Sequence, residues 1–205
     1  VILFLNDHKA ETIERVVAAA KKAGAELGTD NVKFMLASGP VGVMAATNEA
    51  VAAAQNPMTW YVYGAVILLC LLSFRSLRAT LAVIIPLYVV TMLATALMTL
   101  LDIGLTVSTL PVIALGVGIG VDYGIYILTN MTEPLRSGVP LRQAYYQALK
   151  STGSAVLFTA LTLAVGVSTW VFSALKFQVD MGILLTFMFI VNMLGAVFVL
   201  PALAA

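Results

Sequence analysis

Long apolar stretches separated by short polar segments dominate the chain from residue 58 onward. A membrane-spanning helix needs about 20 mainly apolar residues to cross roughly 30 Å of hydrocarbon. On this criterion we expect five spans, of which the last four are long enough to cross without help. The first span is short, and we expect it to begin in a preceding alanine-rich helix at residues 41–54. The predicted spans cover residues 58–74, 80–101, 106–129, 151–172 and 181–204.

Residues 1–57 have a different pattern, in which short apolar runs alternate with helical periodicity. Residues 1–5 and 32–37 are apolar runs typical of strands. Residues 11–23 place apolar side chains at helical spacing, and residues 41–54 are rich in alanine. This order predicts a small β-α-β-α unit. Because the chain opens inside an expected strand, without an initiator methionine or a signal peptide, we also expect it to be part of a longer polypeptide.

The composition supports a membrane assignment for most of the chain. Hydrophobic residues make up 61% and charged residues 10% of it, whereas soluble domains average about 25% charged residues. We therefore expect a mainly α membrane protein preceded by a partial α+β segment. The net charge of +1 argues against a nucleic-acid partner, because phosphate binding needs a concentrated basic surface. Cys70 is the single cysteine and is expected to be a small buried hydrophobe without a disulfide partner.

Basic residues in the loops predict the orientation of the spans. Residues 134–150 are polar but amphipathic, with Leu141, Tyr145 and Leu149 one helical turn apart, so we expect this segment to lie along the membrane surface. Short loops rich in Lys and Arg stay in the cytoplasm, which places residues 1–57 on the opposite side. The basic residues of the predicted cytoplasmic side are Arg75, Arg78, Arg136, Arg142 and Lys150, against Lys176 on the other side.

Asp122 lies inside the third predicted span, and no basic residue occurs within a dozen positions before it. A charged carboxylate at the centre of a bilayer costs about 2.5–3.5 kcal/mol on insertion scales, so intramembrane acids are rare and usually belong to ion or proton pathways. We expect Asp122 to face a packed interior instead of lipid. Since burial disfavours the charged form of a carboxyl group, we expect this residue to load and release a proton.

Four glycines surround Asp122 in the same span. Gly116, Gly120 and Gly124 recur every four residues, the small-residue pattern that lets two helix backbones approach closely. Gly118 lies four residues before Asp122, on what we expect to be a neighbouring stripe of the helix. The span is therefore predicted to be a packing helix that also carries an acid.

Tyr123 follows Asp122 and has two interpretations. Its hydroxyl could donate a hydrogen bond to a carboxylate in the same cluster, although neighbours on a helix point about 100° apart. Packing between helices explains it equally well. Tyr123 also excludes a dinucleotide-binding fingerprint, since it occupies the position of the third glycine and no strand precedes the run.

Hydroxyl groups of the fourth predicted span are candidates for a proton relay with Asp122. Thr159 and Thr162 begin a stripe that continues through Gly166 and Thr169 at intervals of three or four residues. Each hydroxyl could instead bond a carbonyl of its own helix, which is a common habit of threonine. Other polar residues inside the predicted spans are Thr91, Thr95, Thr99 and Asn192.

Several function classes have little support in the sequence. We find no Ser-His-Asp set, no paired carboxylates, no phosphate loop and no metal cluster, so we expect no enzyme activity, no metal and no cofactor. His8 is expected to be a solvated surface residue. A channel is disfavoured, because one aspartate and a few threonines do not make a selectivity ring.

The run GVGIGVDYGIYI at residues 116–127 resembles the Gly-x-x-x-Asp-Tyr signature in the fourth or tenth transmembrane helix of the resistance-nodulation-division superfamily. The runs at residues 157–170 and 181–203 resemble the last two helices of each repeat in that superfamily. The resemblance covers essentially the whole chain. It is greatest to hydrophobe and lipid exporters that include the mycobacterial membrane protein large (MMPL) family.

The resemblance implies proton-driven export of hydrophobic or lipid-like substrates at the bacterial inner membrane. It implies that residues 1–57 end a periplasmic porter domain and that residues 58–205 are the transmembrane part of the C-terminal half. Asp122 would be the proton-binding acid, Tyr123 its partner and Gly118 the matching glycine. The implied partners are protons, the substrate, membrane lipids and the remaining half of the transporter, which typically carries a second Asp-Tyr pair. The resemblance is also compatible with a homo-oligomer and with accessory periplasmic proteins as partners.

Two alternatives to transport stay open at this point. Sterol-sensing domains share the five-helix arrangement and a related Gly and Asp motif, so the chain could bind or sense lipid without transporting it. The other alternative is a structural subunit in which Asp122 only holds helices together through a hydrogen bond. Substitution of Asp122 by Asn separates this last possibility from transport, since Asn keeps the hydrogen-bonding shape but cannot carry a proton.

Overall fold

Helices make up nearly all of the structure, a computed structural model that describes residues 10–28, 40–104, 107 and 109–204. No strand occurs in these ranges. The strands predicted at residues 1–5 and 32–37 lie outside the described residues, so only the helical part of the expected α+β segment is described. The chain divides into two compact units, residues 1–55 with 105–107, and residues 56–104 with 108–205.

The first unit contains α1 (Ala10–Leu27) and the beginning of α2 (Pro40–Phe74). α1 confirms the helix predicted at residues 11–23 and buries Ile13. An exposed ion pair joins Lys21 Nζ to Glu49 Oε2 at 3.1 Å. Exposed pairs of this kind contribute about 0–1 kcal/mol, so this pair adds little to stability.

α2 is one continuous helix of 35 residues. It joins the predicted alanine-rich helix to the first span, which confirms that this span begins in the preceding helix. Pro57 lies inside α2 and cannot donate the backbone hydrogen bond of a regular helix. The second unit begins one residue before this proline.

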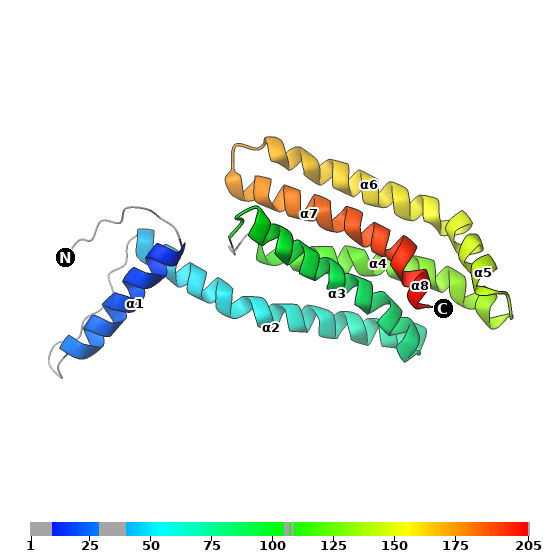
Figure 1. Ribbon diagram of the computed structural model, residues 1–205, viewed down its shortest axis with the longest axis horizontal. Coiled ribbons are helices and arrows are strands. Elements are labelled where there is room, and N and C mark those ends of the chain that lie inside the picture. The colour runs from blue at the N-terminus through cyan, green and yellow to red at the C-terminus, as the bar shows by residue number, and fades with distance from the viewer. Residues whose placement is uncertain (1–9, 29–39, 105–106, 108, 205) are drawn as a thin grey trace. The chain divides into compact units, whose positions relative to one another are not determined.

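The second unit is a bundle of long helices joined by short turns (Figure 1). After α2 it contains α3 (Leu77–Leu100), α4 (Leu110–Arg136), α5 (Leu141–Ala148), the π-helix η1 (Leu149–Gly153), α6 (Ser154–Ser168), the 3-10 helix η2 (Thr169–Phe172), α7 (Lys176–Leu194), the π-helix η3 (Gly195–Val199) and α8 (Leu200–Leu203). Among the described residues, five helical stretches are long and apolar enough to cross a membrane: Gly42–Phe74, Leu77–Leu100, Leu110–Arg136, Leu141–Phe172 and Lys176–Leu203. They confirm the five predicted spans.

Successive spans of the second unit run in alternating directions, so their turns fall at two opposite ends of the bundle (Figure 1). α7 packs on α3, α4 and α6, and α4 also packs on α3 and α5. The basic residues are concentrated at the end formed by the α2–α3 turn, the last turn of α4, and α5. These residues are Arg75, Arg78, Arg136, Arg142 and Lys150.

A buried hydrogen-bonded cluster connects α2 to α3. The hydroxyl of Tyr63 lies 3.1 Å from the carbonyl oxygen of Leu87 and 2.7 Å from Oγ1 of Thr91. The hydroxyl of Thr91 also donates to the carbonyl of Leu87 at 3.0 Å. Thr95 and Thr99 likewise bond the carbonyl four residues earlier. Thr91, Thr95 and Thr99 of the second predicted span therefore all bond carbonyls of their own helix, which is a common habit of threonine.

The segment predicted to lie along the membrane surface, residues 134–150, is not a separate element. Its first residues complete α4, and α5 continues through η1 into α6 without interruption. The amphipathic pattern is present, and its apolar side faces the bundle: Ala144 and Ala148 are fully buried, and Leu141 and Tyr145 pack against the core. The hydroxyl of Tyr145 donates to the carbonyl of Val197 in η3 at 2.7 Å.

Candidate functional site

α4 carries the Gly and Asp motif and has one buried and one exposed face. Because each residue of a helix is rotated by about 100° from the one before, positions two apart point in nearly opposite directions. The buried face contains all three glycines of the four-residue pattern. Its residues are Val112, Ile113, Gly116, Val117, Gly120, Val121, Tyr123, Gly124, Ile127, Leu128 and Met131.

Gly116 and Gly120 let α7 approach the backbone of α4. A methyl group on Gly116 would overlap the side chain of Met188, and one on Gly120 would lie 2.5 Å from Cγ of Asn192. Real Cβ atoms essentially never make contacts this short. A methyl group on Gly124 would lie 3.0 Å from the side chain of Val83 in α3. These glycines therefore serve close packing inside this chain, which is the role that small residues have between membrane helices.

Asn192 adds a specific polar contact to this packing. Its amide Nδ2 donates a hydrogen bond of 2.8 Å to the carbonyl oxygen of Gly116, 76 residues away in the sequence. Asn192 is 4% exposed, so the contact is made in the interior of the bundle. The bond holds α7 against α4 one to two turns before Asp122.

Asp122 lies on the face of α4 opposite to the glycine packing and is exposed. This corrects the expectation that it faces a packed interior of this bundle. The physical reason is the helix rotation: Asp122 follows Gly120 by two positions, about 200°, so its stripe is opposite to the glycine stripe and not beside it. Leu115 and Tyr126 are exposed on the same side as Asp122, and Gly118 has open space around it. No residue that the structure describes forms a hydrogen bond or ion pair with the Asp122 carboxylate.

Tyr123 points away from Asp122, into the core. It is 2% exposed and belongs to the hydrophobic cluster that includes Ile127 and Met131. In the described part of the chain its hydroxyl is the one fully buried side-chain polar atom without a hydrogen-bond partner. A buried polar group left unpaired costs about 1–3 kcal/mol, so this hydroxyl calls for a water or for a partner outside the described residues.

Thr159 and Thr162 are both exposed on α6. α6 contacts α7 most extensively, and its buried positions are Val156, Ala160 and Ala164. The structure therefore does not bring these two threonines together with Asp122 within this chain. The end of the stripe, Thr169, bonds the carbonyl of Gly166 at 2.6 Å.

One contact of the site is not predictable from the sequence. The sequence places Asn192 as a polar residue inside a span, but its bond to Gly116 requires knowing which face of α7 meets α4. The one signal in the sequence is the glycine spacing of α4, which predicts a close neighbour without identifying it. The fold and this site together define a multi-pass membrane protein with an acid on an apolar helix face.

Comparison with known proteins gives the family. The sequence profile of the MMPL family matches residues 5–205. The chain belongs to this family, which agrees with its resemblance to transporters of the resistance-nodulation-division type.

Individual relatives match shorter parts of the chain. A membrane protein of Methanocaldococcus jannaschii, MJ1562, is 29% identical over 117 residues, which cover 57% of this chain and 30% of the relative. A membrane protein of Streptomyces coelicolor, SCO6666, is 33% identical over 89 residues, covering 43% of this chain and 13% of the relative. MmpL12 of Mycobacterium tuberculosis, named as a probable transport protein, is 30% identical over 106 residues, covering 50% of this chain and 9% of the relative. The matches thus span less than a third of each of these relatives.

Proposed function

We propose that this chain is part of a proton-driven exporter of hydrophobic or lipid-like substrates in the bacterial inner membrane, with Asp122 as its proton carrier. Membership of the MMPL family and the transport name of one relative favour a transporter over an enzyme. In this proposal residues 1–57 belong to a periplasmic porter domain, and the basic end of the bundle faces the cytoplasm.

The position of Asp122 carries the proposal. The carboxylate lies in the middle of a membrane-length helix, on an exposed side, without a partner among the residues described. Left charged and facing hydrocarbon, it would cost about 2.5–3.5 kcal/mol. Two events remove this cost: binding of a proton, or cover by another polar surface. A carrier that alternates between the two states needs an acid placed in this way.

The exposed side of α4 also suits a close partner helix. Gly118 precedes Asp122 by one turn, and a methyl group added to it would have no atom within 4 Å. Small residues at such a place allow another backbone to approach. In our proposal the remaining half of the transporter packs here and supplies the polar groups that Asp122 lacks among the described residues.

The test is proton flux in liposomes that contain the full-length parent protein. Asp122→Asn keeps the shape and hydrogen-bonding capacity of the side chain but removes the titratable proton. We expect flux under an imposed proton gradient to fall to the level of protein-free liposomes. Unchanged flux in a correctly folded Asp122→Asn protein would refute the proposal.

Asp102→Asn is the matched control, since it makes the same chemical change outside the helices. Asp102 has a left-handed backbone with φ of 53°, which Asn tolerates as well as Asp, so we expect normal flux. Equal loss in both variants would point to a general defect in folding or insertion. Lipid binding without flux in the unaltered protein would favour a sensing module over a transporter.

A further inference from the structure

The outward face of α5 carries a regular arrangement of cationic and aromatic side chains. Arg142, Tyr146 and Lys150 follow one another at intervals of four residues, so they form one stripe along α5 and η1. All three are exposed, and Tyr146 is 69% exposed. A stripe of this kind on an otherwise packed helix is a surface that is open for a ligand.

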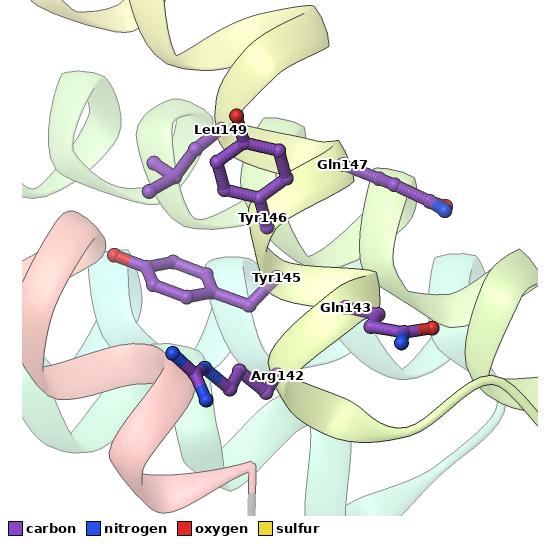
Figure 2. Close-up of a pocket in the computed structure, with 6 residues that line it drawn as sticks. All are labelled: Arg142, Gln143, Tyr145, Tyr146, Gln147 and Leu149. Atoms are coloured by element: carbon purple, nitrogen blue, oxygen red, sulfur yellow. The ribbon is translucent and has the colours of Figure 1, made fainter.

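A surface hollow of about 520 Å³ accompanies this stripe. Figure 2 shows that Arg142 and Tyr145 extend toward one side of α5, that Gln143 and Gln147 extend toward the other, and that Tyr146 lies between the two pairs. The hollow is lined by Arg142, Gln143, Tyr145, Tyr146, Gln147 and Leu149. The lining thus includes a guanidinium group, two carboxamides and the phenol of Tyr146, all of which can donate hydrogen bonds.

The helix that presents these groups is held firmly in place. Ala144 and Ala148 on its opposite side are fully buried. Tyr145 donates a hydrogen bond of 2.7 Å to the carbonyl of Val197, which connects α5 to the far end of the chain. The donors on the outward face are therefore positioned before any ligand binds, which lowers the entropic cost of binding.

The basic side chains of α5 and η1, Arg142 and Lys150, form no ion pair in the described structure. Between Asp122 and Asp180 the sequence has one acidic residue, Glu133. The ion pairs found in the described structure involve Lys21 and Lys22 only, so neither Arg142 nor Lys150 has an acidic partner there. A ligand with negative charge is complementary to this surface.

The depth of α5 in the bilayer follows from the length of its span. The stretch Leu141–Phe172 has 32 residues, which correspond to about 48 Å of helix. The hydrocarbon is about 30 Å thick, so roughly 12 residues extend beyond it. The polar end of the stretch is α5 with η1, because Arg142 and Lys150 are its charged residues. This places the stripe at the level of the lipid headgroups.

We propose that the Arg142–Tyr146–Lys150 face of α5 binds the phosphate headgroup of an anionic phospholipid. Arg142 supplies a planar pair of donors suited to phosphate oxygens, Lys150 adds a second positive charge, and Tyr146 lies at the interface where aromatic rings are favoured. The proposal concerns a lipid of the surrounding membrane and does not depend on the identity of the exported substrate or on proton coupling.

The test is native mass spectrometry of the full-length parent protein titrated with phosphatidylglycerol and, separately, with phosphatidylcholine. We expect a preference for phosphatidylglycerol. The double variant Arg142→Gln with Lys150→Gln should reduce this preference by about 30-fold, because each basic group near a membrane surface strengthens the binding of anionic lipid by about fivefold. The charge-conserving variant Arg142→Lys with Lys150→Arg should retain most of the binding. Thermal unfolding of each variant checks that the fold is unchanged.

The matched control is Arg75→Gln with Arg78→Gln, which removes two charges from the α2–α3 turn at the same end of the bundle. We expect this control to bind phosphatidylglycerol nearly as well as the unaltered protein. An equal loss in both double variants would overturn the proposal in favour of a diffuse charge effect. Equal binding of phosphatidylcholine would overturn it as well. Complete displacement of the lipid by inorganic phosphate at equal concentration would overturn the proposal, because it would show that this face of α5 binds a free anion instead of a lipid.

Discussion

Gly120 gives the sharpest test of how α4 and α7 are held together. In Gly120→Ala the new methyl group would lie 2.5 Å from Cγ and 2.6 Å from both Nδ2 and Oδ1 of Asn192. Asn192 would have to move, and its 2.8 Å bond to the Gly116 carbonyl would be lost. Overpacking costs about 1–3 kcal/mol, and the lost hydrogen bond costs about 0.5–1.5 kcal/mol. Alanine recovers about 0.5–1 kcal/mol in a helix, so we expect a net destabilisation of about 0.5–4 kcal/mol.

The assay is equilibrium unfolding in detergent: the parent protein and each variant are titrated with denaturant until they are fully unfolded, and their free energies of unfolding are compared. Gly64→Ala is the matched control, because Gly64 lies within α2 and nothing is within 4 Å of the added methyl group. We expect this control to be neutral or slightly stabilising. If Gly120→Ala were as stable as Gly64→Ala, the close approach of α4 and α7 at Asn192 would be refuted.

Three further substitutions test the buried polar groups, each by the same unfolding assay. Asn192→Leu removes the donor to Gly116 and overfills the space beside Gly120, so we expect a loss of about 1–4 kcal/mol; a variant as stable as the parent would contradict the contact. Tyr63→Phe removes the hydroxyl that joins α2 to α3, and we expect a loss of about 0.5–1.5 kcal/mol. Tyr123→Phe removes a hydroxyl without a partner in the described structure, so we expect no loss of stability, and a role of this hydroxyl in the proton relay would show as reduced proton flux. Equal destabilisation by the two Tyr→Phe changes would show that the Tyr123 hydroxyl is bonded in the folded protein.

The membrane-spanning helices could be predicted from the sequence because an apolar stretch of about 20 residues has few other stable environments. Their ends were less accurate. The structure extends the span predicted at 106–129 to Arg136 and joins residues 141–150 to the following span. Polar residues such as Arg142 interrupt the apolar pattern but not the backbone hydrogen bonds, so hydropathy alone ends these helices too early.

The sequence predicts which residues form the candidate site better than it predicts how they are arranged. The four-residue spacing of Gly116, Gly120 and Gly124 correctly indicates close helix packing. Asp122 was expected on the packed side, but two helical positions separate it from Gly120, and this rotation turns it outward. The partner Asn192 could not be assigned, because periodicity within one helix carries no information on its rotation relative to another.

The central claim, that Asp122 carries the transported proton, is tested most directly in the unaltered parent protein. A membrane-permeant carbodiimide reacts with protonated carboxyl groups, and mass spectrometry gives the modified fraction of Asp122, with Asp102 and Asp180 measured in the same digest. We predict that Asp122 is the acid modified first and that proton flux falls in proportion to its modified fraction. Full flux from a protein in which Asp122 is completely modified would contradict the account.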